Sequence, residues 1–166
     1  MLPKNSLKPS LYQTSEQVID CDLNSTDAAV LLKSGKVQLI NTLTGENEIQ
    51  IDNAKMIACG KNFYVVVVRE NNRDKIVMWA NEVFYRGLFI FGNTLPKTYL
   101  QEIESINQIL SKENSNVKKL QVVEESIAML LENGSLYTWG NNSSGNLGLK
   151  RTMCAGEDEL VNSNPQ

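Results

Sequence analysis

Several stretches of the chain alternate apolar and polar residues with a period of two, the pattern of strands that bury one face. The clearest lies over 117–122, and apolar runs follow over 126–132 and 135–139. Asn133 and Gly134 stand between the last two runs, and both accept the positive φ that a two-residue hairpin turn needs. The pattern therefore predicts three consecutive antiparallel strands in this part of the chain.

The same succession occurs twice earlier, in weaker form. One set of strands is expected over 17–22, 28–32, 36–40 and 48–51, and a second set over 55–60, 63–68 and 75–79. Cys21 and Cys59 fall at matching places (59 − 21 = 38), and Val122 is the matching residue of the third set. Four strands per unit, recurring at several tens of residues, is typical of β-propeller blades.

These spacings predict the organisation of the chain. We expect a tail over 1–15 and one domain over 16–166, in units of about 17–51, 52–93 and 94–166. The longer interval before the third unit (122 − 59 = 63) indicates an insertion, at about 84–111. Whether the second unit ends at Trp79 or at Phe91 stays open.

Part of the insertion has a helical pattern. Its apolar residues that share one helix face are Leu100, Ile103, Ile106 and Leu110. Thr98 and Gln101 have the spacing of a capping box just before this face begins. We therefore predict a helix over 98–111, with an edge strand over 99–103 as the alternative.

Composition excludes several classes of function. The chain has 166 residues, with 16 Lys and Arg against 19 Asp and Glu, which gives a net charge of −3. This acidic balance removes the electrostatic drive toward nucleic acid, so no nucleic-acid partner is expected. The absence of histidine excludes Ser-His-Asp and Cys-His catalytic sites and His-ligated metals. We predict no catalytic residue, no cofactor and no metal.

Cysteine usage and hydropathy bear on the location of the protein. Cys21, Cys59 and Cys154 form no Cys-x-x-Cys pair, which favours reduced thiols in an intracellular protein. The longest apolar run, 63–68, is too short to span a membrane. A cytoplasmic or nuclear protein is expected. The tail over 1–15 lacks acidic residues, so an organelle-targeting segment is the less favoured alternative.

Residues 136–148 (LYTWGNNSSGNLG) carry the most specific motif. The run is similar to the signature of the regulator of chromosome condensation repeat, a family whose blades end in a Tyr-x-Trp-Gly-x-Asn-x-x-Gly-Gln-Leu-Gly pattern. The residues that match are Tyr137, Trp139, Gly140, Asn142, Gly145, Leu147 and Gly148. Gly134 matches the hairpin turn of that family, Gly60 matches its second-strand motif, and Asn146 replaces the usual Gln. The resemblance is strong over 117–149, fair over 55–79 and faint over 17–40.

The resemblance implies an all-β fold, in which four-stranded antiparallel blades form the N-terminal part of a seven-bladed propeller with one inserted helix. Trp139 is expected to fill the wedge between neighbouring blades, where its truncation would cost about 3–5 kcal/mol. The motif glycines allow positive φ in the loop that follows. Gly140 and Gly145 have the spacing of a phosphate-binding loop, but Asn146 and Leu147 stand where Lys and Ser or Thr are needed. No nucleotide site is predicted.

Three units are too few to close a ring, since the smallest usual propellers have about four blades. We therefore expect the open end to be completed by further chain or by a partner. The founding member of the family exchanges nucleotide on the small GTPase Ran and docks on chromatin, whereas other relatives are scaffolds. We predict a non-catalytic protein-interaction or scaffold module that contacts its protein partner through the insertion. Guanine-nucleotide exchange on a Ran-like GTPase is the alternative, and an unrelated all-β domain is the third interpretation.

Overall fold

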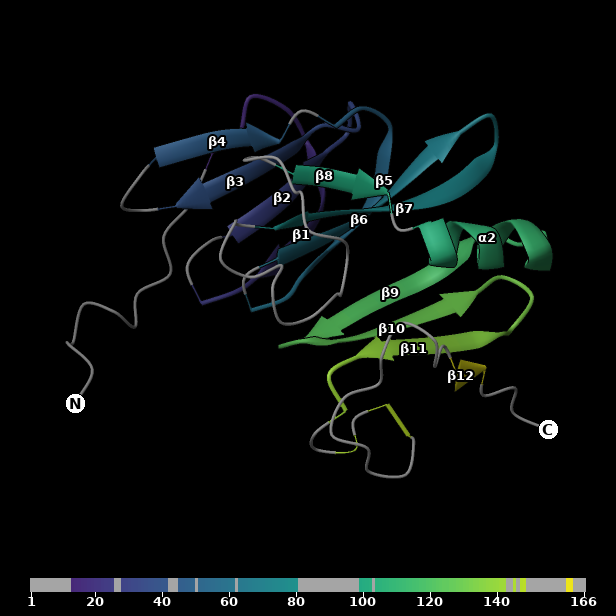
Figure 1. Cartoon of the computed structure of the whole chain (residues 1–166). Coiled ribbons are helices and arrows are strands. Elements are labelled where there is room, and N and C mark those ends of the chain that lie inside the picture. Colours follow the sequence, from purple (N-terminus) through teal and green to yellow (C-terminus); the bar gives the residue numbers. More distant parts are fainter. Residues whose placement is uncertain are drawn as a thin grey trace.

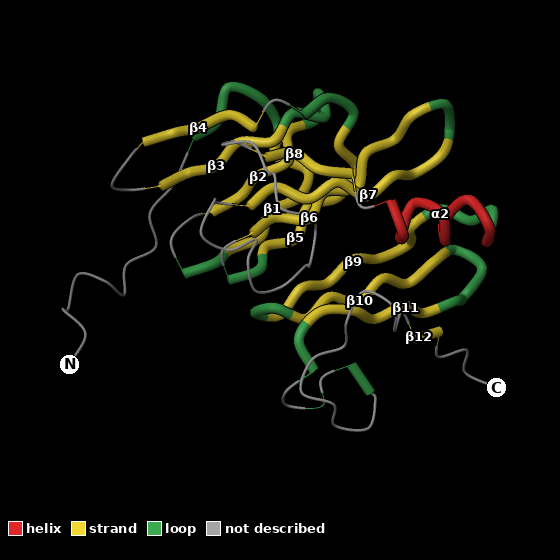
Figure 2. Tube along the Cα trace, in the orientation of Figure 1, coloured by secondary structure: helices red, strands yellow, loops and turns green. Residues whose placement is uncertain are grey.

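The computed structural model describes residues 13–25, 28–41, 45–49, 51–61, 63–80, 99–102, 104–142, 145, 147–148 and 161–162. This part of the chain forms three antiparallel sheets of four strands each and one helix (Figure 1 and Figure 2). The all-β fold and the four-stranded units expected from the sequence are confirmed.

The strands follow chain order within every sheet, which requires only local connections. The first sheet contains β1 (Val18–Leu23), β2 (Ala28–Leu32), β3 (Val37–Asn41) and β4 (Gly45–Ile49). The second sheet contains β5 (Ala54–Cys59), β6 (Phe63–Glu70), β7 (Arg73–Ala80) and β8 (Tyr99–Glu102). The third sheet contains β9 (Val117–Val123), β10 (Ser126–Leu131), β11 (Leu136–Gly140) and β12 (Val161–Asn162).

The first strand of each sheet lies beside the first strand of the next, and we call β1, β5 and β9 the inner strands. Their pairing register slips at the same place in each, after Val18, after Ala54 and after Val117. This shared bulge aligns the three units. When the sheets are aligned on this bulge, Cys21 and Cys59 are offset by two residues, so the predicted match of these two cysteines is wrong. The offset arises because the turns that follow the inner strands differ in length.

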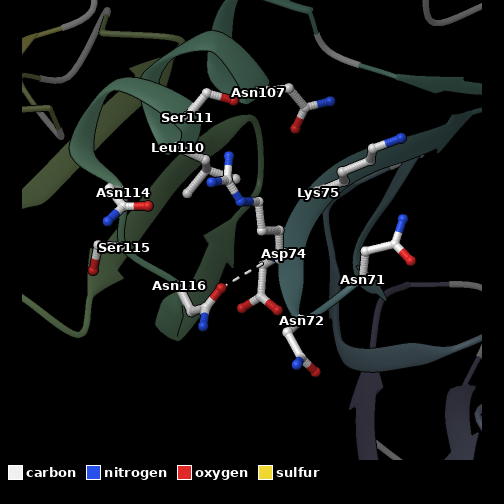
Figure 3. Close-up of a pocket in the computed structure, with 11 residues that line it drawn as sticks. Asn71, Asn72, Asp74, Lys75, Asn107, Leu110, Ser111, Asn114, Ser115 and Asn116 are labelled. Carbon is white, nitrogen blue, oxygen red and sulfur yellow. Dashed lines mark hydrogen bonds between the residues drawn. The ribbon is translucent and has the colours of Figure 1, made fainter.

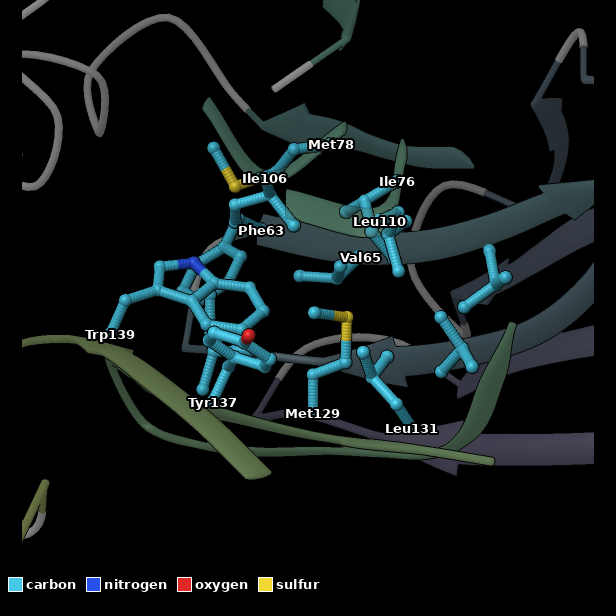
Figure 4. Close-up of a cluster of buried hydrophobic side chains, with 13 residues drawn as sticks. Phe63, Val65, Ile76, Met78, Ile106, Leu110, Met129, Leu131, Tyr137 and Trp139 are labelled. Atoms are coloured by element: carbon cyan, nitrogen blue, oxygen red, sulfur yellow. The ribbon is translucent and has the colours of Figure 1, made fainter. Parts of the chain in front are cut away.

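The second sheet lies between the other two (Figure 1), and its position explains its sequence. Residues 63–68 of β6 are all buried, because alternate side chains point to the first and to the third sheet. Tyr64, Val66 and Val68 pack against the first sheet. Phe63, Val65 and Val67 pack against the third sheet, in the cluster drawn in Figure 4.

The helix begins later than predicted. Helix α2 spans Glu104–Glu113, whereas Tyr99–Glu102 forms β8 and pairs with β7. The edge strand was the correct alternative here, because the open edge of β7 needs hydrogen-bond partners. The second sheet therefore includes residues up to Glu102. The strand expected around Phe91 lies outside the described residues.

Helix α2 is part of the core and also covers the edge of β7. Ile106 and Leu110 are buried in the cluster between the second and third sheets. Beyond the end of β8, the Asn107 side chain substitutes for a strand: its Oδ1 accepts from Ile76 N–H at 2.8 Å and its Nδ2 donates to Ile76 O at 3.2 Å. This segment of the predicted insertion therefore holds two blades together, and its buried side is unavailable for partner contacts.

The two ends of the stack carry different elements. At the end where the inner strands finish, which we call the loop face, Lys61 N–H donates to Glu124 O at 2.9 Å and links the second and third sheets. At the opposite end, the hairpin face, lie helix α2 and the turns that follow β2, β6 and β10 (Figure 1). Each face is thus formed by corresponding turns of successive sheets.

Candidate functional site

The aromatic residues of the C-terminal motif lie between the second and third sheets. Tyr137 and Trp139 are alternate residues of β11, and each is only 5% exposed in the shared cluster (Figure 4). Trp139 is thus placed between two blades, as the sequence predicts for a wedge. Its aromatic ring adds a large apolar area to the interface.

Gly140 permits the closest approach of two backbones in the motif. Its φ is +105°, and a Cβ at this position would lie 2.2 Å from the carbonyl oxygen of Glu125. The next residue, Asn141, donates its N–H to the same oxygen at 3.0 Å. A side chain at Gly140 would therefore separate the end of β11 from the β9–β10 turn.

The remaining motif residues shape the turns around this strand. Gly134, Gly145 and Gly148 have positive φ and open space where a Cβ would stand, while Gly60 lies directly against the ring of Phe63. Asn142 is fully buried, and its Oδ1 accepts from Leu147 N–H at 3.1 Å. Leu147 O in turn accepts from Thr138 Oγ1 at 3.0 Å, which fixes Leu147 beside β11.

Two buried donors of the motif lack an acceptor in the described part of the chain. They are Trp139 Nε1 and Asn142 Nδ2. A buried donor without a partner costs about 1–3 kcal/mol, so such groups normally have one. This end of the third sheet therefore has hydrogen-bonding capacity that the described residues leave unused.

Glu113, the last residue of α2, joins the helix to the β10–β11 hairpin. It accepts hydrogen bonds from Tyr137 Oη at 2.6 Å, Asn133 Nδ2 at 2.8 Å and Ser135 Oγ at 3.3 Å. These donors, Tyr137 foremost, lower the pKa of Glu113. Burial, and then the bond to Glu113, raises the pKa of Tyr137 to about 12. The motif tyrosine thus stabilises the blade as a neutral phenol.

A buried carboxylate connects the second and third sheets on the hairpin face. Asp74 accepts from Arg69 Nε at 2.8 Å, Lys55 Nζ at 3.0 Å and Val117 N–H at 2.9 Å. Burial alone would raise the pKa of Asp74, but these three hydrogen bonds outweigh it and lower the pKa. Lys55 also donates to Val117 O at 2.9 Å, so the cluster joins β5, β7 and β9.

Asp74 also lines a cleft of about 280 Å³ between the β6–β7 turn and α2 (Figure 3). Amide side chains dominate its lining, from Asn71, Asn72, Asn107, Asn114 and Asn116. Asn116 Oδ1 accepts from Asp74 N–H at 3.2 Å, and Asn107 is bonded to Ile76. The central polar groups of the cleft are therefore committed to holding the blades together.

The hydrogen bonds of Asp74, Asn107 and Glu113 join the second sheet, helix α2 and the third sheet. The described residues contain no group of three His, Cys, Asp or Glu side chains that could hold a metal. Cys21 and Cys59 are not joined by a disulfide, and Cys154 lies outside the described residues. Sequence reasoning missed Asp74, Asn107 and Glu113, because each acts through residues 24 to 43 positions away. The buried apolar neighbours of Asp74 in β7 were the available signal.

The outward side of the third sheet repeats the residues by which the other sheets pack. Leu31 pairs with Val37 in the first sheet, Val67 with Ile76 in the second and Leu130 with Leu136 in the third. A second set of equivalent cross-strand pairs, one from each sheet, consists of Ala29 with Leu39, Val65 with Met78 and Ala128 with Thr138. In the first two sheets these positions are buried against the following sheet.

In the third sheet the corresponding residues have no following sheet among the described elements. Ala128, Leu130, Leu136 and Thr138 are only half-buried, and Val123 beside them is 66% exposed. We call these five residues the trailing face. It has the pattern of a blade interface whose second half is absent from the described part of the chain.

Comparison with known proteins identifies the motif. Residues 133–166 match the family model of the regulator of chromosome condensation (RCC1) repeat. No curated protein matches the sequence of the chain. The family match thus covers the second half of the third sheet, β11 and β12, together with the motif run 136–148.

Comparison with solved structures identifies the fold. Human WBSCR16 is similar with a TM-score of 0.68 and 16% identity, over 89% of this chain and 40% of that protein. Prp20p from Saccharomyces cerevisiae, which has binding properties to Gsp1p and histones, gives a TM-score of 0.61 and 14% identity, over 84% of this chain and 34% of that protein. Yeast RCC1 (Prp20) bound to Kap60 gives 0.56 and 14%, over 79% and 31%. The chain thus spans less than half the length of these proteins.

These matches show an RCC1 repeat and the fold of RCC1-like propellers, with a partial set of blades. Among the described helices, none is long and apolar enough to cross a bilayer.

Proposed function

We propose that this chain, which carries an RCC1 repeat and has the fold of RCC1-like propellers, is a non-catalytic protein-interaction module of an intracellular scaffold. Its sheets form a rigid stack that is completed on the trailing face by further blades and presents the turns of its two end faces to a protein partner. One observation carries this proposal: the trailing face repeats the positions by which the first two sheets pack.

The internal polar links support a scaffold role. The Asp74 cluster, the Asn107 side chain and the Glu113 bonds each join parts of two blades, so the turns on each face are held at fixed separations. Rigid presentation lowers the ordering cost of binding a partner. The two unpaired buried donors, Trp139 Nε1 and Asn142 Nδ2, fit a blade end that is completed by another element.

The test is the native mass of the protein isolated from its source, combined with cross-linking. We expect a species well above 18.6 kDa in which residues of the trailing face, such as Leu136 and Thr138, lie next to further sheet structure. A species of 18.6 kDa whose trailing face stays open to solvent contradicts the proposal.

Guanine-nucleotide exchange on a Ran-like GTPase, with chromatin association, is the second candidate. The observation that favours it is the likeness to Prp20p, which binds Gsp1p and histones. A nucleotide-release assay separates the two functions: acceleration by the intact protein favours exchange, and an unchanged release rate favours the scaffold.

A further inference from the structure

The β2–β3 turn of the first sheet bonds to the start of the next inner strand. Gly35 O accepts from the N–H of Ala54, the first residue of β5, at 3.0 Å. The approach is close, because a Cβ at Gly35 would lie 3.1 Å from the Cα of Asn53. One carbonyl group of the turn thus determines where the next sheet begins.

The second sheet makes the equivalent contact with a side chain. Asp74 stands two residues before Ile76, as Gly35 stands two residues before the equivalent position of β3. Its Oδ2 accepts from the N–H of Val117, the first residue of β9, at 2.9 Å. Lys55, the extra residue of the bulge in β5, donates from Nζ to Val117 O at 2.9 Å. Both backbone groups of Val117 are therefore bonded to the preceding sheet.

Gly134 in the third sheet is the counterpart of Gly35. Each glycine stands two residues before an equivalent strand position, Leu136 or Val37, and each has positive φ. The two turns have the same internal hydrogen bonds. The space beside Gly134 is open, however, and its carbonyl oxygen accepts no hydrogen bond from the described residues. The acceptor that positions a following sheet in the first blade is therefore unused in the third.

Lys118 is the counterpart of Lys55. The register of β9 with β10 passes from Val117 to Lys119, so Lys118 is the extra residue of the bulge, as Lys55 is in β5. Lys118 is exposed, and within the described part of the chain its ammonium group has no ion pair or hydrogen bond. Lys118 thus stands where its counterpart reaches the following inner strand.

The residues that begin the inner strands share their chemistry. Val18, Ala54 and Val117 each precede the bulge, and each has a small or β-branched apolar side chain. Ala54 and Val117 are buried, whereas Val18, which has no described sheet before it, is 38% exposed. A residue of this kind, with a free N–H, is what a preceding sheet binds in this fold.

We propose that Gly134 and Lys118 together bind the first residue of the next inner strand, at the hairpin-face end of the trailing face. Gly134 O accepts the N–H of that residue, and the Lys118 ammonium group donates to its carbonyl oxygen. We call these the docking contacts. The occupant is a further blade of the same propeller, because the docking contacts continue those by which the described sheets join.

The docking contacts specify the register and the sequence of the occupant. Its first inner-strand residue is valine, alanine or a residue of similar size, and it is not proline, which has no N–H to donate. The inference rests on the proposed completion of the trailing face and adds where the completing blade begins.

The first test compares lysine acetylation in the 166-residue chain and in the assembly isolated from its source, read by mass spectrometry. Lys118 is expected to react rapidly in the chain alone and about tenfold more slowly in the assembly, because a bonded amine must be released before it reacts. Lys55, which is bonded in both states, gives the slow reference rate. The exposed Lys33 and Lys112 give the fast one. An unchanged rate of Lys118 overturns the proposal.

Two matched variants of the isolated chain test whether the two lysines differ as described. Lys55→Met should lower the urea midpoint of the 166-residue chain, because it removes bonds to Asp74 and Val117. Lys118→Met should leave this midpoint unchanged, because its acceptor belongs to the next blade. A lowered midpoint in Lys118→Met would show that this lysine is already bonded within the chain and would overturn the proposal.

The same substitution in the assembly separates the docking contact from simple covering of the surface. A thiol is placed on the trailing face by Leu130→Cys, with Cys21 and Cys154 replaced by Ser, and its maleimide labelling is followed. Lys118→Met should accelerate labelling about tenfold, since a hydrogen bond from a charged donor is lost. Lys119→Met is the control and should leave the rate unchanged, because β5 has methionine at the equivalent position. Equal rates in the two variants overturn the proposal.

Gly134→Ala tests the other docking contact with the same thiol. In the assembly the added methyl group should meet the next inner strand, as a Cβ at Gly35 would meet Asn53, and labelling should accelerate about fivefold. In the chain alone the space is open and the labelling rate should not change. An unchanged rate in the assembly overturns the assignment of Gly134.

The two proposals fail separately. If the Leu130→Cys thiol is protected in the assembly while Lys118 reacts as fast as in the chain alone, the docking contacts are wrong and the completed stack stands. If the native protein is an 18.6 kDa species with an open trailing face, the proposed function is wrong as well.

Discussion

The second and third sheets are built from the same succession of strands, yet they differ in how many of their faces are covered. In β6 of the second sheet, six consecutive residues are buried, because sheets lie on both sides of it. In β10 of the third sheet, burial alternates residue by residue, since its trailing face has no described sheet against it. The burial pattern along a strand thus indicates whether neighbouring sheets cover one or both faces of its blade.

The largest expected effect tests this difference with neighbouring residues. Met129→Ala on the covered side should cost about 2–5 kcal/mol, whereas Leu130→Ala on the trailing face should cost about 1 kcal/mol. In the second sheet, Val66→Ala and Val67→Ala should each cost about 2 kcal/mol, because both positions are fully buried. Urea unfolding of the four variants measures these values. Similar costs for Met129→Ala and Leu130→Ala would refute the comparison.

The next effect concerns the charged cluster between the two sheets. Asp74→Asn should cost about 3 kcal/mol, at the lower end for a buried ion pair because Lys55 and Arg69 reach solvent. Glu70→Gln, which breaks the exposed pair with Lys75, is the matched control and should cost less than about 1 kcal/mol. Equal losses in the two variants would show that the cluster does not hold the sheets together.

The Asp74 cluster also predicts a pH dependence. The pKa of Asp74 is lowered in the folded protein, so its contribution is full above the ordinary pKa of about 3.8 and is lost as the pH falls through the lowered value. The stability difference between wild type and Asp74→Asn should therefore shrink below that range. Unfolding curves at a series of acidic pH values measure it, and a constant difference would contradict the assignment.

Substitution of Gly134, which precedes β11, or of Gly140, which ends it, should lower the stability less than loss of the Asp74 cluster, and by different amounts. Gly134→Ala strains only the backbone, because φ is positive but the space is open, and should cost about 1–2 kcal/mol. Gly140→Ala also drives a methyl group against Glu125 O and should cost more. Thermal unfolding compares the two. The reverse order would mean that the close approach at Gly140 is relieved by a shift of the turn.

The smallest effect concerns the hydroxyl group of the motif tyrosine. Tyr137→Phe should cost about 1 kcal/mol by removing the bond to Glu113. Because the pKa of Tyr137 is raised to about 12, its contribution is full below the ordinary value of about 10 and is lost between about 10 and 12. A spectrophotometric titration should show one tyrosine with this late pKa in the wild type. Its persistence in Tyr137→Phe would assign it to another residue.

The sequence predicted the fold correctly where the hydrophobic pattern of a segment and its contacts in the folded protein favour the same element. Alternation over 117–122 and the turn at Asn133 and Gly134 gave the third sheet, and the run over 63–68 gave a buried strand. The helix start was wrong because periodicity over 99–102 fits both a helix and a strand, and the open edge of β7 decided for the strand. Tertiary hydrogen bonding thus overrode the local pattern.

The candidate site was predicted only in part, for the same reason. Trp139 and Gly140 are recognised from a sequence motif. Asp74 and Asn107, in contrast, form hydrogen bonds to residues that are far away in the chain. The trailing face became visible only when the strand registers aligned Leu31, Val67 and Leu130. That equivalence depends on the shared bulge, which no single stretch of sequence shows.

The most direct test of the central claim measures whether the trailing face is covered in the native protein. Leu130→Cys in a Cys21→Ser, Cys154→Ser background places a thiol on this face, and the rate of maleimide labelling reports its access to solvent. We expect the thiol to react in the 166-residue chain alone and to be protected about tenfold or more in the assembly isolated from its source. Equal labelling rates in the two states would show that nothing packs on the trailing face and would contradict the account.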